Sequence, residues 1–175
     1  RQALLKRRRP DLAIVSLRGN VDTRLRKLHA GEVDATVLAL AGLKRLGRAD
    51  ATTAIFSLDE CLPAVGQGII AIEARADDAR TLALLAAVDH PDSATALACE
   101  RAFLAVLEGS CRTPIAGHAT VAAGRLRFRG LIAKPDGSDA VETEREGAVA
   151  DAVALGTDAG RELKARAGAD FFAPV

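Results

Sequence analysis

Short apolar runs alternate with amphipathic stretches over the first sixty residues. Residues 12–17 and 35–40 are apolar and rich in strand-forming side chains, which predicts two buried strands. Helical patterns flank these runs at residues 2–9, 20–29 and 41–46. Strands that alternate with helices in this way favour a parallel sheet with right-handed crossovers, so we expect an α/β domain here.

A different pattern begins at residues 62–68, where one proline and two glycines permit a hinge. Residues 69–72 are predicted as another buried strand, and residues 78–88 as an amphipathic helix. This strand and helix have no sheet of their own in the sequence that follows.

The C-terminal half predicts a small α+β domain. One helix is expected from a cap at Asp92 or Ser93 to Leu107, and another over residues 151–167. Three antiparallel strands are expected between these helices, at residues 116–122, 126–133 and 140–146. We expect helices to cover one face of this sheet.

Composition narrows the class of protein. The 175 residues are 49% apolar with a net charge of +1, which favours neither a nucleic-acid nor a membrane partner. No apolar run approaches the roughly 18 residues of a membrane span, and 3% aromatic residues leave little for base stacking. Three cysteines without framework spacing favour a reduced, cytoplasmic setting. Methionine is absent, even at position 1, so we expect a piece whose N-terminal part is missing.

Basic residues concentrate at the start of the chain, where residues 1–27 hold nine Lys or Arg against two acidic residues. Arg18 follows the first predicted strand, and Arg24 lies in the helix after it. Free backbone N–H groups, the positive helix end and two guanidinium groups predict a carboxylate or phosphate site. The alternative is that these arginines are solvated helix-face charges, and for residues 7–9 we keep that interpretation.

Cys111 is the one cysteine whose setting suggests chemistry. It lies in residues 108–115, where a helical pattern ends at a glycine and a proline leads into a strand. The neighbouring Arg112 favours the reactive thiolate, while the negative end of the preceding helix opposes it, and an inert loop cysteine is the alternative. Cys61 and Cys99 are interpreted as small hydrophobic residues, and the spacing of cysteines and histidines predicts no metal site.

Four separated segments support a family resemblance. They are residues 9–24 with Arg-Pro-Asp and Ser-Leu-Arg-Gly-Asn, residues 39–47 with Ala-Gly-Leu-Lys-Arg-Leu-Gly, residues 62–68, and residues 100–115 with Glu-Arg-Ala-Phe and the cysteine loop. In this order and at this spacing they resemble the porphobilinogen deaminase family, also called hydroxymethylbilane synthase. The resemblance covers nearly the whole chain.

The resemblance implies a transferase of tetrapyrrole (haem) biosynthesis. Such an enzyme joins four porphobilinogen units head to tail into hydroxymethylbilane and releases ammonia each time. Its dipyrromethane cofactor is made from substrate and held by a thioether to the loop cysteine, here Cys111, because a soft thiolate traps an electrophilic methylene carbon well. The implied partners are porphobilinogen and oligopyrrole intermediates, without nucleic acid or membrane, and a monomer is expected at full length.

The resemblance also implies which residues bind cofactor and substrate. Pyrroles with acetate and propionate groups need guanidinium partners. The matching positions are Arg1, Arg18, Arg24 and Arg45, with Ala39, Gly42 and Gln67 in segments that line the family's cleft. Ser110 stands where the family has a second glycine. The family's catalytic aspartate would lie upstream of Arg1, so we expect this polypeptide alone to be inactive, and ammonia release from porphobilinogen would contradict that.

By the same resemblance, residues 1–62 form part of a second domain and residues 63–68 a hinge. Residues 69–90 are then a strand and helix of the first domain, and residues 91–175 a third, α+β domain with Cys111. The first two domains are expected to be like periplasmic binding proteins. Two other classes remain open: a non-catalytic anion-binding module that uses Arg18 and Arg24, and a thiol redox protein, for which no nearby resolving cysteine exists.

Overall fold

The structure is a computed structural model that describes residues 1–109, 113–168 and 170–172. It divides into two compact units, of which the larger contains Arg1–Leu12 and Cys61–Val175 and the smaller contains Ala13–Glu60. The larger unit is therefore built from two stretches of sequence, because the chain leaves it after Leu12 and returns at Cys61.

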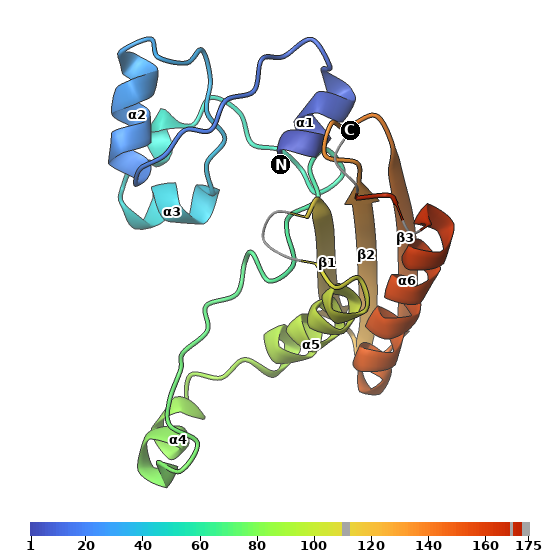
Figure 1. The fold of residues 1–175 in the computed structure, drawn as a ribbon. Helices are drawn as coiled ribbons and strands as arrows, with labels where there is room; N and C mark the ends of the chain where they lie inside the picture. Colours follow the sequence, from blue (N-terminus) through green and yellow to red (C-terminus); the bar gives the residue numbers. More distant parts are fainter. Residues whose placement is uncertain (110–112, 169, 173–175) are drawn as a thin grey trace. The chain divides into compact units, whose positions relative to one another are not determined.

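A three-stranded antiparallel sheet forms the centre of the larger unit (Figure 1). Its strands β1 (Ile115–Ala122), β2 (Arg125–Ala133) and β3 (Ala140–Ala148) pair in sequence order. The turn between β1 and β2 places Ala123 and Gly124 at φ 50° and 72°, a backbone that suits the twist of a two-residue hairpin. The sheet and its helices confirm the predicted mixture of α and β structure.

Two long helices, α5 (Pro91–Val106) and α6 (Ala152–Ala167), cover one face of this sheet (Figure 1). The short 3-10 helix η2 (Val149–Asp151) leads into α6. The rings of Phe103 and Phe128 meet edge to face with centroids 5.0 Å apart. The largest fully buried side chains of this core are Phe103, Phe128, Leu126, Ile132, Leu163 and Cys99. Burial of an aliphatic or aromatic side chain of this size contributes roughly 2 kcal/mol to folding.

Glycines on α6 let the two helices approach closely. A Cβ atom added to Gly156 would collide with the carbonyl oxygen of Cys99, and one added to Gly160 would lie 2.8 Å from Cβ of Val106. The helix backbones are therefore in contact at this crossing, which a larger residue would prevent.

The second face of the sheet has partial cover from α1 (Gln2–Arg8). A smaller apolar cluster forms there from Ala3, Leu62, Ala116, Leu131 and Ala133. From the sequence we expected helices on one face of the sheet only, so the packing of α1 on the second face was not predicted. Further along the same face, arginines of β2 pair with glutamates of β3, with Arg127 3.5 Å from Glu146 and Arg129 3.2 Å from Glu144.

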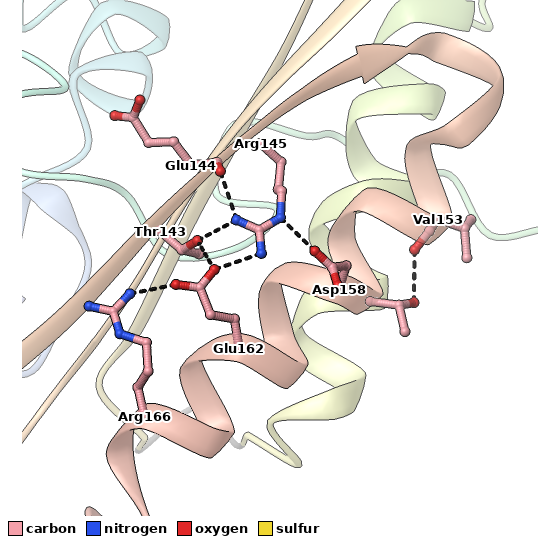
Figure 2. Close-up of polar contacts among 8 residues, drawn as sticks. Thr143, Glu144, Arg145, Val153, Asp158, Glu162 and Arg166 are labelled. Atoms are coloured by element: carbon pink, nitrogen blue, oxygen red, sulfur yellow. Dashed lines mark hydrogen bonds and ion pairs between the residues drawn. The ribbon is translucent and has the colours of Figure 1, made fainter.

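A polar network joins β3 to α6 at the edge of the core (Figure 2). Glu162 accepts hydrogen bonds from Thr143, Arg145 and Arg166, each at 2.6 Å. Arg145 also contacts Asp158 at 2.7 Å. The hydrogen bonds from Thr143, Arg145 and Arg166 lower the pKa of Glu162 to about 2.

Among the described residues, four helices lie outside this core. They are α2 (Val21–His29), α3 (Leu40–Arg45) and the 3-10 helix η1 (Ala49–Ala51) in the smaller unit, and α4 (Ala79–Leu85) in the larger. Helices α2, α3 and α4 are close to where the sequence predicts helices, and the short 3-10 helix η1 was not predicted. The predicted cap at Asn20 is confirmed, because its side chain accepts a hydrogen bond from the N–H of Thr23 at 2.9 Å.

The predicted N-cap of α5 is wrong by two or three residues. Its N-cap is His90, whose Nδ1 accepts from the N–H of Ser93 at 3.2 Å, rather than Asp92 or Ser93. Pro91 occupies the first helical position, where its fixed φ and missing N–H cost nothing, so the helix begins earlier than predicted.

The three predicted buried strands at residues 12–17, 35–40 and 69–72 are corrected by the structure. The described residues contain one sheet, β1 to β3, and these segments are not part of it. A strand needs a hydrogen-bonded neighbour, and these segments have none among the described residues. Their side chains are not buried either, since Val15 and Ile70 are 65% and 71% exposed. The predicted parallel sheet is consequently not formed within the part of the chain described.

Candidate functional site

The start of α2 positions two of the predicted anion-binding arginines in the smaller unit. Arg24 is partly buried, and its Nε donates to the carbonyl oxygen of Gly19 at 2.9 Å. Arg18 is exposed and forms no ion pair or hydrogen bond with the described residues, so its donors are available. Asp22 also lies in this first helical turn, where it pairs with Arg48 at 3.2 Å. Arg48 therefore offsets the one negative charge that would compete with an anion here.

The other predicted residues of the smaller unit lie on α3. Ala39 is its N-cap in an extended conformation and supplies no side-chain cap. Gly42 lies near the start of α2, because a Cβ added to it would be 4.0 Å from Cγ2 of Val21. Arg45 is exposed in the last turn. Gly42 is thus brought close to the α2 start, while Arg45 lies at the opposite end of its short helix.

The larger unit brings two further predicted residues together. Nη2 of Arg1 donates to Oε1 of Gln67 at 2.9 Å, although 66 positions separate them in the sequence. Both line a cavity of about 290 Å³. Its remaining lining is largely apolar: Ala3, Leu4, Leu62, Ala64, Thr113, Pro114, Ile115, Ala116, Leu131 and Ala133. One guanidinium beside small apolar side chains suits a flat ring that carries carboxylates.

This cavity adjoins the cysteine loop. Cys111, with Ser110 and Arg112, lies outside the described residues, but Thr113 and Pro114 line the cavity directly after them in the sequence. The carbonyl oxygen of Pro114 accepts from the N–H of Ala133 at 2.9 Å, which ties the end of the loop to β2.

The start of the loop is held by α6. Lys164 Nζ donates to Glu108 at 2.7 Å and to the carbonyl oxygen of Val106 at 3.3 Å. Glu108 has a left-handed φ of 53°, and a Cβ at Gly109 would lie 2.9 Å from Leu104 and also meet Ile115. The segments on both sides of Cys111 are therefore fixed to the α5–α6–sheet body.

Glu100 is a residue near the site whose role the sequence did not reveal. It is 6% exposed on α5 and accepts hydrogen bonds from the N–H groups of Gly66 and Ala119 at 2.7 and 2.8 Å. The available signal was a charged residue within an apolar stretch of the predicted helix. A second cavity, of about 350 Å³, lies beside Glu100 and shares Gln67 with the first.

The other two cysteines differ in exposure. Cys99 is fully buried, which agrees with its interpretation as a small hydrophobic residue. Burial is the larger cause that raises the pKa of its thiol to about 12, and the nearby charge of Glu100 adds to it. Cys61 is half-buried with a free thiol. Within the described residues, no cluster of three or more His, Cys, Asp or Glu could hold a metal ion. No described helix is both long enough and apolar enough to cross a membrane.

Comparison with known proteins identifies the family. Residues 1–83 match a family model described as "Porphobilinogen deaminase, dipyromethane cofactor binding domain", and residues 94–165 match "Porphobilinogen deaminase, C-terminal domain". The chain belongs to the porphobilinogen deaminase family. The resemblance seen in the sequence is thereby confirmed, and the alternative of a non-catalytic anion-binding module is not favoured.

Individual porphobilinogen deaminases are similar to most of this chain. Those of Nitrobacter hamburgensis and Nitrobacter winogradskyi are each 60% identical over 172 residues, which cover 98% of the chain and 54% of the relative. That of Paracoccus denitrificans is 56% identical over 172 residues, 98% of the chain and 55% of the relative. The chain spans about half the length of the porphobilinogen deaminases it matches.

The predicted site residues are distributed over the ranges of both matched family models. The model named for the dipyromethane cofactor covers all seven predicted site residues other than the cysteine, from Arg1 to Gln67. Cys111 falls in the range matched by the C-terminal porphobilinogen deaminase model.

Proposed function

We propose that the protein containing this chain is a hydroxymethylbilane synthase, a transferase that joins four porphobilinogen units with release of ammonia. The observation that supports this most is the match of residues 1–83 to a porphobilinogen deaminase domain named for the dipyromethane cofactor. The 60% sequence identity to the porphobilinogen deaminase of Nitrobacter hamburgensis, over nearly the whole chain, is independent support. We further propose that the protein acts in the cytoplasm as a monomer, on porphobilinogen and oligopyrrole intermediates.

In this proposal Cys111 holds the dipyrromethane through a thioether. The cofactor, when bound, supplies the pyrrole end to which new units are added. The cavity beside the loop fits such a group, because its lining combines apolar side chains with the Arg1 guanidinium. Arg1 has five N–H donors, so it can bind a carboxylate while one donor remains on Gln67.

Arg18, Arg24 and Arg45 are proposed to bind the acetate and propionate groups of cofactor and product. The free donors of Arg18 and the N–H groups at the start of α2 support this role. Arg24 uses its Nε on Gly19, which leaves its terminal nitrogens for a carboxylate and fixes the direction of the guanidinium. Ala39 and Gly42 are proposed to let the ligand come close to the α3 backbone, because neither residue has a large side chain that would block it.

We also propose a periplasmic-binding-protein-like sheet in the longer polypeptide, with domain boundaries at 62, 68 and 90. Residues 12–17, 35–40 and 69–72 would then pair with strands from elsewhere in that polypeptide. The exposure of Val15, Ile70 and Ile72, at 65%, 71% and 60%, supports this, because large apolar side chains are rarely exposed so fully without a partner. Amide exchange at residues 69–72 should be slower in the longer polypeptide than in this chain alone, because the strand would have a partner there. Equal rates in the two would contradict the proposal.

Intact-mass spectrometry tests the covalent step. The protein that contains this sequence, purified from a host that makes porphobilinogen, should carry an added mass of dipyrromethane size. Cys111→Ala should remove this mass, whereas the control Cys61→Ala should retain it. An adduct that survives Cys111→Ala, or no adduct in the unaltered protein, would reject the assignment of Cys111.

A further inference from the structure

Glu100 is a buried carboxylate that the proposed chemistry does not use. It lies on α5 between Cys99 and Arg101, and its side chain is enclosed with the apolar core. In the part of the chain that the structure describes, no Lys, Arg or His forms an ion pair with it. A carboxylate buried without a cation is unfavourable unless hydrogen-bond donors replace the lost water. The donors around Glu100 therefore indicate what it does.

Those donors come from two segments that are far apart in the sequence. Oε1 accepts from the N–H of Ala119 in β1 at 2.8 Å, and Oε2 accepts from the N–H of Gly66 at 2.7 Å. Because β1 is an edge strand, its outer N–H groups lack a neighbouring strand, and Glu100 occupies that place. The carbonyl oxygen of Pro63 accepts from Gly117 at 2.9 Å on the same edge. Residues 62–68 are thus attached to β1 both directly and through Glu100.

This attachment continues to the cavity beside the cysteine loop. Gly66, at φ 68°, directly precedes Gln67, and Gln67 accepts a hydrogen bond from Arg1, with both side chains in the lining of the cavity. A change in the backbone at Gly66 would redirect the side chain of Gln67 and release Arg1. We propose that Glu100 is a positioning residue: it locks residues 62–68 against β1 and so fixes Gln67 and Arg1 at the cavity.

The lock is a property of this chain, and only the roles of Gln67 and Arg1 in binding rest on the proposed function. Amide exchange measured residue by residue with NMR tests it without any ligand. Glu100→Gln keeps the size of the side chain but replaces one acceptor oxygen with an NH₂ donor, which cannot accept from an N–H group. We expect exchange at Gly66 or at Ala119, whichever amide then faces the NH₂ group, to accelerate by about tenfold or more, since its hydrogen bond to a carboxylate is lost. Amides of Phe128 and Ile132, in the centre of the sheet, should keep their rates.

The matched control is Glu73→Gln, which makes the same chemical change on an exposed carboxylate and should leave Gly66 unaffected. If Glu100→Gln fails to fold, Glu100→Asp replaces it, because a shorter side chain with two oxygens cannot reach both segments, and the same selective acceleration is expected. Unchanged exchange at both Gly66 and Ala119, or equal acceleration throughout the sheet, would overturn the proposal. The adduct on Cys111 is measured separately, so the proposed function and the lock can fail independently.

Discussion

Single glycines decide how closely the two long helices pack. Gly156 faces the carbonyl oxygen of Cys99, and Gly160 faces Val106 and the carbonyl oxygen of Phe103. Both glycines have ordinary helical backbone angles, so their requirement is for space rather than for a left-handed conformation. In a helix, glycine normally costs about 1 kcal/mol relative to alanine. Here the close approach of α5 and α6 outweighs that cost.

Gly156→Ala is expected to destabilise the protein by about 3 kcal/mol despite the better helix propensity of alanine. The added methyl group would force the helices apart, because its nearest neighbour is backbone and cannot rotate away. Gly68→Ala is a suitable control, since no atom lies within 4 Å of an added Cβ there. Urea unfolding measures both. A loss below about 0.5 kcal/mol for Gly156→Ala would mean that the helices separate easily.

Residues differ in how much of their role can be predicted from sequence. Cys99 could be predicted as a core residue because its neighbours in the sequence are apolar. The role of Glu100 could not, since its two donors are 34 and 19 positions away. Arg1 and Gln67 were selected by family resemblance, but a pairing across 66 positions follows only from the fold.

Among the elements, β3 and α6 are joined by charged groups as well as by the core. Glu162 is only partly exposed, at 32%, and its carboxylate meets two arginines and a threonine hydroxyl (Figure 2). Because each of these donors prefers the charged carboxylate, the folded state holds the pKa of Glu162 at about 2 against an ordinary 4.5. Folding stability consequently depends on pH through this residue.

The sign of that dependence follows from the lowered pKa. The contribution of Glu162 is fully present above pH 4.5 and is lost as pH falls toward about 2, because the unfolded chain then binds a proton first. The difference in unfolding free energy between the unaltered chain and Glu162→Gln should therefore shrink over this range. Urea unfolding at a series of pH values measures it, with Glu73→Gln as the control for loss of an exposed carboxylate. A difference independent of pH would show that the network does not favour the charged form.

Helices and hairpin strands could be predicted because their signals are local. The Asn20 cap, the glycines after helices and the alternation within β1 to β3 each lie within a few residues of the element they define. The segments at 12–17 and 69–72 have equally apolar sequences but no hydrogen-bonded neighbour among the described residues. A parallel strand depends on partners distant in sequence, so composition alone cannot establish that it forms.

At the scale of the whole molecule, the larger unit depends on contact between its two stretches of sequence. Helix α1 packs on the second face of the sheet, and the turn between β2 and β3 lies against it. Gly137 in this turn has φ 79°, and a Cβ there would lie 2.6 Å from the carbonyl oxygen of Ala3 and from the nitrogen of Arg7. Only glycine satisfies both the backbone angle and the contact.

Gly137→Ala should detach α1 while leaving the sheet folded. Amide exchange in α1 should accelerate, whereas amides in the centre of β2 should keep their rates. Gly124→Ala is the matched control, because Gly124 also has a positive φ, 72°, but nothing within 4 Å of an added Cβ. It should show the strain of a left-handed alanine, about 1 kcal/mol, without detachment of α1. Equal exchange of α1 in the two variants would mean that the contact at Gly137 is not needed.

The discontinuity of the larger unit also has a consequence for the order of events on the ribosome. Helix α1 is synthesised before the turn that receives it, because Gly137 in that turn is translated more than a hundred residues later. At translation rates of roughly 5–20 residues per second, this interval is on the order of ten seconds. During that time the nascent α1 has no docking surface, while the intervening Ala13–Glu60 is already complete. Ala3 and Leu4 therefore cannot pack against Leu131 and Ala133 until β2 has been made, so docking of α1 has to follow synthesis of the C-terminal half.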